Sequence, residues 1–406
     1  QSDSLYQSLI AKASLLHLQR NYADAIDLYE KVFQIRLPDA LAAYKAAGVY
    51  ALDSNANKAV HYLRYSLTSG WTEADWLSFD PYFDYLRNAH PDRWKAIEEQ
   101  AFASELLYEK TLQLPGLRKE INLMTLNDQK LRYQYAQANT EDTRQHISGQ
   151  ITQSDLRNMD RAKEIIMRYG WPKVSQIGKD GQNNLWLIIQ HADHDVLFQK
   201  AALLAMEKLI GTSELSMENY AFLYDRVQCN LNYRQLYGTQ VTWTSGGEAS
   251  AFRPIAKEGT VDERRKEIGL QPLHLYSLTY GFVYDAITVE EAKQRDSIYH
   301  ADVQCLIDSA KFYYTTKEFN KTYDLYNKAS TFLGGMSNAD NYEAAVIFSR
   351  IASEDNDRKY RSIALDFLQL QFLRGELTRA ELNDQPAFGI LHSERRWVDL
   401  YRRLKG

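Results

Sequence analysis

The stretch Asn21-Tyr22-Ala23-Asp24-Ala25-Ile26-Asp27-Leu28-Tyr29-Glu30-Lys31 decides how this chain begins to fold. Its pattern and that of the residues before it return 34 positions later: Leu9, Ala13, Leu16, Ala25 and Tyr29 are followed by Ala43, Ala47, Tyr50, Ala59 and Leu63. A fixed period of this length, with small residues at intervals, predicts pairs of antiparallel helices. The small side chains let paired helices approach closely where they cross, and the aromatic and leucine positions fill the groove.

The same plan returns near the end of the chain. At a constant offset of 297, the counterparts of Tyr22, Asp27, Leu28, Tyr29 and Lys31 are Phe319, Asp324, Leu325, Tyr326 and Lys328. At an offset of 305, the counterparts of Ala59, Leu63, Gly70, Leu77, Pro81, Phe83 and Leu86 are Ala364, Leu368, Gly375, Leu382, Pro386, Phe388 and Leu391. A period of about 34 residues is typical of tetratricopeptide repeats. We therefore predict two tetratricopeptide-like modules, each with a helical cap, at residues 1–100 and 296–406.

Two repeats leave apolar faces at both ends, because about three are needed for a free-standing stack. We expect both modules to cover these faces by packing against the middle of the chain, as structural scaffolding. The alternative is that one concave repeat face binds a peptide or a protein partner.

Composition narrows the class of protein. The 406 residues are 45% hydrophobic and 25% charged, which is ordinary for a globular protein of two or three domains. A net charge of -5 and the lack of any basic block predict no nucleic-acid partner. No apolar run approaches the roughly 18 residues that a membrane-spanning helix needs. The start, Gln1-Ser2-Asp3-Ser4, has neither Met nor an apolar leader, which suggests a mature periplasmic or secreted protein, with a cytoplasmic one as the alternative.

The middle, residues 105–295, is predicted to be a helical domain with one β-hairpin. Residues 240–244 alternate apolar and polar side chains, Ser245-Gly246-Gly247 supplies a turn, and residues 249–255 return. Residues 137–150 lack periodicity and are predicted as a loop or an exposed helix start, and Asp180-Gly181 is predicted as a turn. The fold class is therefore mainly α.

Several motifs of this middle region together resemble an uncharacterised bacterial family, the domain of unknown function 6624. They are Gly170-Trp171-Pro172, Trp186, Gln190-His191-Ala192-Asp193, Phe198-Gln199, Asp225-Arg226, Gln235-Leu236-Tyr237-Gly238-Thr239-Gln240, Val261-Asp262-Glu263-Arg264-Arg265 and Gly269-Leu270. The resemblance runs from about residue 128 to residue 276. It implies domain boundaries and candidate residues but no reaction.

The residues around His191 permit three interpretations. On a continuous helix, His191, His194 and Asp195 would share one face and could hold a divalent metal. Against this, Asp193 or Asp195 could cap a new helix that starts at Val196. His191 would then be a catalytic base or a structural, hydrogen-bonded histidine. Because no HExxH-like pattern is present and Cys229 and Cys305 lack zinc-ligand spacing, we predict no metal and no cofactor.

A second polar group follows at Asp225-Arg226, inside an apolar helix where charges are costly unless matched. We predict that Asp225, Arg226 and His191 lie close together. In a hydrolase, His191 would be the base, Asp193 or Asp225 would orient it, and the ligand would be bound by Arg226, Gln190, Gln199, Tyr237 and Gln240. The alternative is a non-enzymatic scaffold in which these residues lock the domain together, so the sequence does not decide whether the chain is an enzyme.

Overall fold

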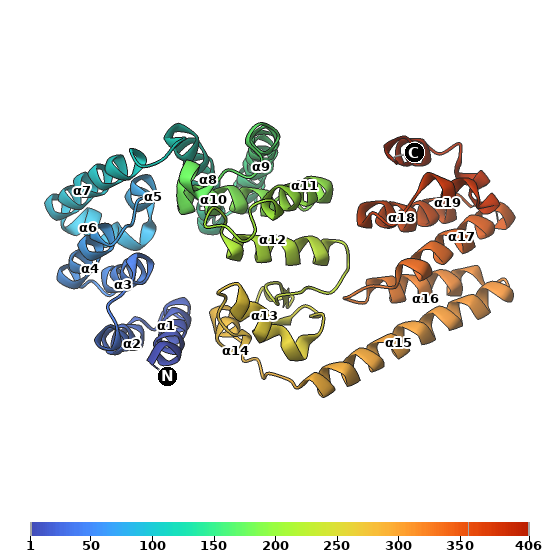
Figure 1. The fold of residues 1–406 in the computed structure, drawn as a ribbon, viewed down its shortest axis with the longest axis horizontal. Coiled ribbons are helices and arrows are strands. Elements are labelled where there is room, and N and C mark those ends of the chain that lie inside the picture. Colours follow the sequence, from blue (N-terminus) through green and yellow to red (C-terminus); the bar gives the residue numbers. More distant parts are fainter. Residues whose placement is uncertain (1, 356, 405–406) are drawn as a thin grey trace. The chain divides into compact units, whose positions relative to one another are not determined.

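The computed structural model describes residues 2–355 and 357–404, and nearly all of its regular structure is helical (Figure 1). Within those residues the only sheet is an antiparallel hairpin of β1 (Val241–Trp243) and β2 (Ala249–Phe252), where the sequence predicted one. The predicted mainly α class is confirmed. In the described part of the chain, no helix is both long and apolar enough to cross a membrane.

The contacts divide the chain into two compact units. The first comprises Gln1–Leu223, Val241–Ala251 and Asp262–Ala286, and the second comprises Tyr224–Gln240, Phe252–Val261 and Ile287–Gly406. The chain thus passes from the first unit to the second between Leu223 and Tyr224, within one helix. It returns to the first unit at the start of β1 and leaves it again near the end of β2. The domain limits predicted from the sequence, 1–100, 105–295 and 296–406, stay predictions.

The first unit opens with two helix pairs, α1 (Ser2–Leu18) with α2 (Tyr22–Ile35), and α3 (Ala40–Leu52) with α4 (Ala56–Thr68). The turns within the pairs repeat in detail. Arg20 and Ser54, which are 34 residues apart, both adopt a positive φ, and the next residue in each case caps the second helix with its side chain. These caps are Asn21, which accepts from the N–H of Asp24, and Asn55. Lys317, at the offset of 297 from Arg20, has the same backbone conformation in the second unit.

Small residues explain how closely the pairs pack. Ala43, Ala46 and Ala47 on α3 are fully buried, so α4 can lie against the α3 backbone. Short cap elements then lead into the long helices of the middle. The remaining elements of the first unit before α12 are α5 (Ala74–Phe79), η1 (Pro81–Phe83), α6 (Asp84–Ala89), α7 (Pro91–Glu109), α8 (Pro115–Gln137), α9 (Glu141–Tyr169), α10 (Val174–Gln190) and α11 (Val196–Glu207).

The structure decides two local predictions in the middle region. Of the two alternatives for residues 137–150, the exposed helix start is confirmed, because α9 begins at Glu141, capped by the Thr140 side chain. The predicted turn at Asp180-Gly181 is wrong, because both residues lie within α10 and the irregular residue is Gly178, whose φ is 74°. A Cβ at Gly178 would collide with the side chains of Tyr108 and Asp180, so this kink brings the α10 backbone close to α7.

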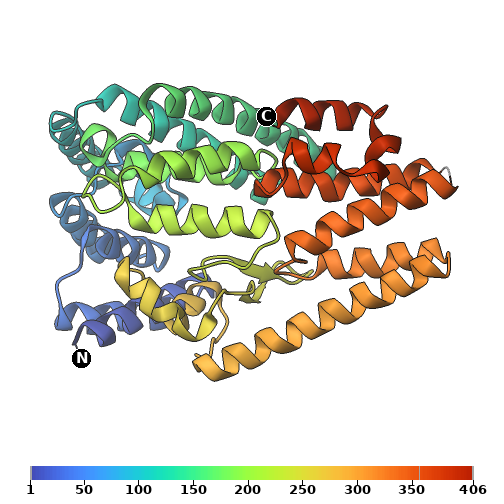
Figure 2. The same cartoon turned by 45° about the vertical axis from the view of Figure 1, so that its right-hand side comes forward.

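The chain then forms α12 (Met217–Asn230), the hairpin, η2 (Glu258–Thr260), α13 (Val261–Glu267), α14 (Leu273–Tyr276) and η3 (Ser277–Tyr280). In the second unit, α15 (Val289–Thr315) lies alongside α16 (Phe319–Thr331), which Figure 2 shows, and α17 (Asn338–Asp355) pairs with α18 (Arg358–Arg374). The last elements are α19 (Arg379–Asn383), η4 (Pro386–Leu391) and α20 (Arg395–Arg403).

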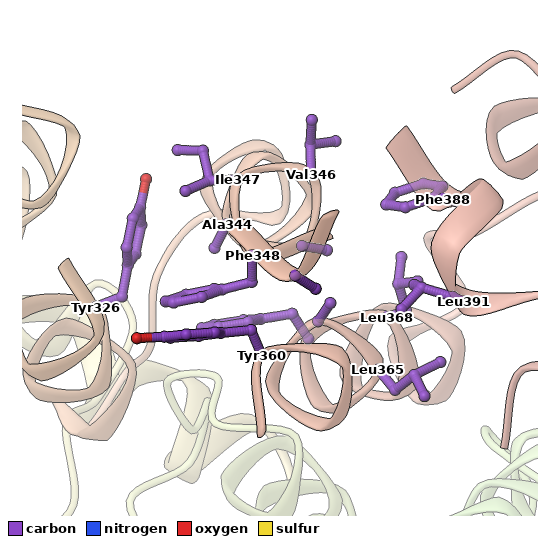
Figure 3. Packing of buried hydrophobic residues seen from close by; sticks show 14 of the residues in the cluster. Tyr326, Ala344, Val346, Ile347, Phe348, Tyr360, Leu365, Leu368, Phe388 and Leu391 are labelled. Carbon is purple, nitrogen blue, oxygen red and sulfur yellow. The ribbon is translucent and has the colours of Figure 1, made fainter. Parts of the chain in front are cut away.

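The core of the second unit is aromatic. Phe348, Tyr360 and Tyr326 converge between α16, α17 and α18, and Phe388 closes the far end (Figure 3). Phe388 lies 5.8 Å from Trp397, measured between ring centroids. In the first unit, Phe83 lies 5.8 Å from Trp94. Because Phe83 and Phe388 are counterparts in the internal repeat and each contacts a Trp of a later helix at the same distance, the two cap regions share this aromatic contact.

Candidate functional site

His191 lies in a turn between two helices. It ends α10 as the C-cap residue, and Asp195 caps α11 by accepting a hydrogen bond from the N–H of Phe198 at 3.1 Å. The helix-start interpretation is therefore confirmed, and a single helix with His191, His194 and Asp195 on one face is wrong. The carboxylate of Asp195 also pairs with Lys163 at 2.8 Å, and together with the N–H of Phe198 this pairing lowers the pKa of Asp195.

Three of the predicted ligand or catalytic residues meet around this turn. Gln199 is fully buried on α11, and its amide donates to the carbonyls of Ile189 and Gln190 at 3.2 and 3.4 Å. It also donates to Asp193 Oδ1 at 3.2 Å. A buried amide that binds the carbonyls at a helix end fixes the turn, because it adds a side-chain hydrogen bond where the regular helical hydrogen bonds stop. Gln190, Asp193 and Gln199 are thus brought together by the folding of the turn itself.

Among the candidate site residues, Asp225 accepts hydrogen bonds with both of its carboxylate oxygens. Its side chain is fully buried on α12, and its two oxygens accept from the backbone N–H groups of Leu236, Tyr237 and Thr239 and from the Thr239 hydroxyl. These distances lie between 2.7 and 3.1 Å. Burial raises the pKa of Asp225, and the hydrogen bonds from the loop oppose that rise. Asp225 therefore holds the loop that follows α12.

Gln235 fixes the other side of the same loop. Its buried amide donates to the carbonyls of Gln240 and Arg253, and its oxygen accepts from the N–H of Gln240 at 2.8 Å. The Gln240 side chain donates to the Thr239 hydroxyl. In the second unit the structure thus brings Asp225, Tyr237 and Gln240 together through the loop backbone. Arg226 is half-buried on the same helix. The approach of His191 to Asp225 and Arg226 stays a prediction.

The first unit contains a pocket that no spacing in the sequence indicated, and we call it the charged pocket. Its volume is about 320 Å³, and it is lined by Tyr6, Gln7, Ile10, Arg36, Asp39, Glu218, Phe222, Arg265, Gly269, Leu270, Gln271 and Tyr276. These residues come from α1, the α2–α3 turn, α12, α13, α14 and the segment between α13 and α14. Only Arg265, Gly269 and Leu270 belong to motifs singled out in the sequence. The others lie too far away in the chain for any local pattern to join them.

Two arginine–tyrosine stacks form part of the wall of the charged pocket. The Arg36 guanidinium carbon lies 4.4 Å from the centre of the Tyr6 ring, and that of Arg265 lies 4.7 Å from the centre of the Tyr276 ring. Arg265 is only 1% exposed and donates from Nε to the carbonyl of Gln271 at 2.7 Å. Stacking of this kind holds a guanidinium in place while its outer N–H groups point away from the ring.

A buried ion-pair network is a second feature that sequence reasoning missed. The fully buried guanidinium of Arg118 on α8 binds Glu105 at 2.9 Å, Glu109 at 3.1 Å and Asp180 at 2.6 Å. It also donates to the carbonyl of Thr72 at 2.7 Å. Because these partners lie on α7, on α10 and before α5, Arg118 ties the N-terminal elements to the middle of the chain.

Glu73 lies beside this network, and the pKa of its carboxyl group is shifted. Burial raises the pKa of Glu73 to about 7 and the charge of Asp180 adds to the rise, whereas Asn184 and Arg118 oppose it. Asn184 donates to Glu73 at 3.0 Å. The adjoining cavity measures only about 20 Å³, room for a water molecule and too small for a substrate. We interpret the network as structural.

Comparison with known families matches one segment of the chain. Residues 115–287, from the start of α8 to just before α15, match a family of unknown function (DUF6624). The match encloses all the motifs on which the sequence resemblance rested. Neither curated proteins nor solved structures yielded a match. The middle of the chain is therefore similar to an uncharacterised domain family.

Proposed function

We propose that this protein binds a small zwitterionic ligand, such as a free amino acid or the end of a peptide, in the charged pocket. The pocket offers two cations, Arg36 and Arg265, and two carboxylates, Asp39 and Glu218. A ligand with one carboxylate and one ammonium group would complement both sets, and charge-assisted hydrogen bonds are the strong ones. The aromatic rings of the wall suit an apolar side chain.

One observation carries this proposal. Tyr6 is only 5% exposed and lines the pocket, yet its hydroxyl has no hydrogen-bond partner among the residues that the structure describes. Buried polar atoms are normally paired, and one that is not calls for an explanation such as a bound ligand. A ligand carboxylate beside Arg36 would provide the missing acceptor.

We favour binding over hydrolysis because the polar residues of the middle region form hydrogen bonds that hold the backbone in place. Asp225 accepts hydrogen bonds from four donor groups of its own loop, and Gln199 and Gln235 each bridge backbone groups. On this proposal the helix pairs at either end are tetratricopeptide-like, and the first of them supplies one wall of the pocket. A hydrolase centred on His191 is the competing hypothesis.

The test is calorimetric titration of the full chain with leucine, N-acetyl-leucine and leucinamide. Leucine should bind most tightly, because each of the other two lacks one of the two charges. Tyr6→Phe removes only the hydroxyl and should weaken leucine binding by roughly 2- to 12-fold, the value of one hydrogen bond of about 0.5 to 1.5 kcal/mol. Tyr326→Phe, which removes another buried hydroxyl without a described partner, is the matched control. If leucine gives no saturable heat, or if Tyr6→Phe binds it as the unchanged protein does, the proposal fails.

A further inference from the structure

The second unit contains a hollow that the internal repeat explains. We call it the aromatic hollow; its walls include Tyr323, Ser330, Phe348, Ile363, Phe367 and Leu370, from α16, α17 and α18. Its volume is about 260 Å³. An apolar cavity of about 150 Å³ already accepts a benzene molecule. The hollow therefore has room for one aromatic ring.

The corresponding place in the first unit can be identified from the internal repeat. Phe367 is the counterpart of Tyr62 at the offset of 305, and Tyr326 is the counterpart of Tyr29 at the offset of 297. Tyr326 and Phe367 contact each other with ring centroids 6.4 Å apart. Phe348, which stacks on Phe367 with centroids 6.0 Å apart, is not the counterpart of Tyr50, which stacks on Tyr62. The surroundings of Tyr62 and of Phe367 are therefore the ones that can be compared.

One ring of the first unit has no counterpart in the second. Phe33 packs between Tyr29 and Tyr62, with centroid distances of 5.6 and 5.3 Å. At the offset of 297, Phe33 corresponds to Ser330, which has no ring and lines the hollow together with Phe367. The Ser330 hydroxyl bonds the carbonyl of Asn327 in its own helix at 2.9 Å. The hollow thus lies where the first unit carries a phenylalanine ring.

We propose that the aromatic hollow receives an aromatic side chain from a peptide segment of a partner protein. The internal repeat indicates the occupant, because its first copy fills this place with a side chain delivered from a helix. The rim offers the exposed side chain of Asn327, a neutral donor and acceptor suited to a peptide backbone. Asp366, also on the rim, pairs with Arg396 at 2.6 Å, so it adds no uncompensated charge that would repel an apolar ring. This proposal concerns the second unit and does not depend on the charged pocket.

The probe is the capped peptide acetyl-Gly-Gly-Phe-Gly-Gly-amide, titrated into the full chain and followed by nuclear magnetic resonance. We expect saturable binding roughly tenfold or more tighter than that of the same peptide with Ala in place of Phe, because burial of a phenyl ring is worth at least that factor. Ser330→Phe should fill the hollow and weaken binding of the Phe peptide by a similar factor, without lowering the melting temperature. Ser353→Phe, on an exposed part of α17 outside the hollow, should leave binding unchanged.

Three results would overturn the proposal: equal binding of the Phe and Ala peptides, unchanged binding by Ser330→Phe, or binding of toluene without binding of the peptide. The last would make the hollow a small-molecule site. If Ser330→Phe loses its helical circular dichroism, Ser330→Leu serves in its place. Leucine occupies the same volume only in part, so it should weaken binding of the Phe peptide less than Phe does but clearly more than the Ser353 control.

Discussion

At the scale of single residues, Asp225 ties the loop of residues 236–239 to α12 by accepting hydrogen bonds from four donor groups of that loop. Asp225→Asn would present an amide N–H₂ to backbone N–H groups and leave some of them without an acceptor. Breaking a buried, charge-assisted network of this kind typically costs about 3 kcal/mol or more. We therefore expect a clear fall in the free energy of unfolding, measured by urea titration.

The same measurement separates a structural role from a catalytic one. If His191 and Asp225 formed an active site, their replacement should leave stability unchanged or slightly higher, because active sites are commonly held at some cost in stability. His191→Ala serves as the companion variant. Unchanged urea midpoints in both variants would contradict the structural role that we assign to Asp225.

Glu73 should make stability depend on pH. Its pKa in the folded protein is about 7, above the usual value near 4.5, so the folded state binds its proton more strongly than the unfolded chain does. The resulting stabilisation is present below about pH 4.5 and is lost as the pH rises towards 7 and beyond. Glu73→Gln mimics the protonated form. Between pH 5 and pH 8 we expect its melting temperature to fall less than that of the unchanged protein.

The two falls in melting temperature should differ by about 2 to 4 °C for each kcal/mol by which protonation of Glu73 stabilises a unit of this size. Glu98→Gln, on α7 in the same unit, is a suitable control for the loss of one negative charge. Parallel melting profiles of Glu73→Gln and the unchanged protein across this pH range would refute the assignment.

At the scale of elements, the start of α15 depends on a glycine. A Cβ at Gly259 in η2 would come within 2.5 to 2.8 Å of backbone atoms of Thr288 and Val289. Backbone atoms cannot move aside as a side-chain end can, so Gly259→Ala should separate η2 from α15. We expect a loss of roughly 2 kcal/mol or more, in the range of overpacked cores. Thermal unfolding measures it.

Gly149 provides the matched control within α9. Nothing lies within 4 Å of a Cβ built at Gly149, and the residue is exposed. Replacement of a mid-helix glycine by alanine stabilises a helix by roughly 0.5 to 1 kcal/mol. The free energy of unfolding should therefore fall in Gly259→Ala and rise in Gly149→Ala. An unchanged or higher free energy of unfolding for Gly259→Ala would show that η2 does not pack tightly on α15.

At the scale of the whole molecule, the second unit includes residues that precede the hairpin. The Asn232 side chain donates to the carbonyls of Ser330 and Phe332, and the buried Arg374 donates to the carbonyls of Leu231 and Asn232. A fragment of residues 224–406 should therefore melt several degrees higher than a fragment of residues 287–406. Each lost buried hydrogen bond removes on the order of 1 kcal/mol, and a protein of about this size shifts its melting temperature by roughly 2 to 4 °C per kcal/mol.

This comparison also tests the boundary at residue 296 that the sequence predicted. If both fragments melt at the same temperature, the C-terminal domain is complete without residues 224–261. A lower melting temperature for the full-length Asn232→Ala variant, alongside an unchanged one for Asn327→Ala, would place the effect on the Asn232 contacts.

Local patterns in the sequence were sufficient for the helix pairs and for the hairpin. The hairpin follows from an alternation with a period of two around a Ser-Gly-Gly turn, and the helix pairs follow from small and aromatic residues that recur after 34 positions. Even the start of α11 at the Asp195 cap was among the alternatives that the sequence allowed. Where local signals conflicted, as at Asp180-Gly181, the prediction failed because packing of α10 against Tyr108 determines the position of the kink.

What the sequence by itself determined is therefore the helical class, the hairpin and the internal repeat, because these depend on residues that are neighbours in the chain or recur at a fixed spacing. Only the tertiary structure decided that Asp225 holds a loop, that Arg118 gathers three carboxylates, and that Tyr6 and Arg265 line one pocket. The partners of such side chains are chosen by how helices pack. Packing depends on surfaces that separate parts of the chain present to one another, and no local spacing encodes that choice.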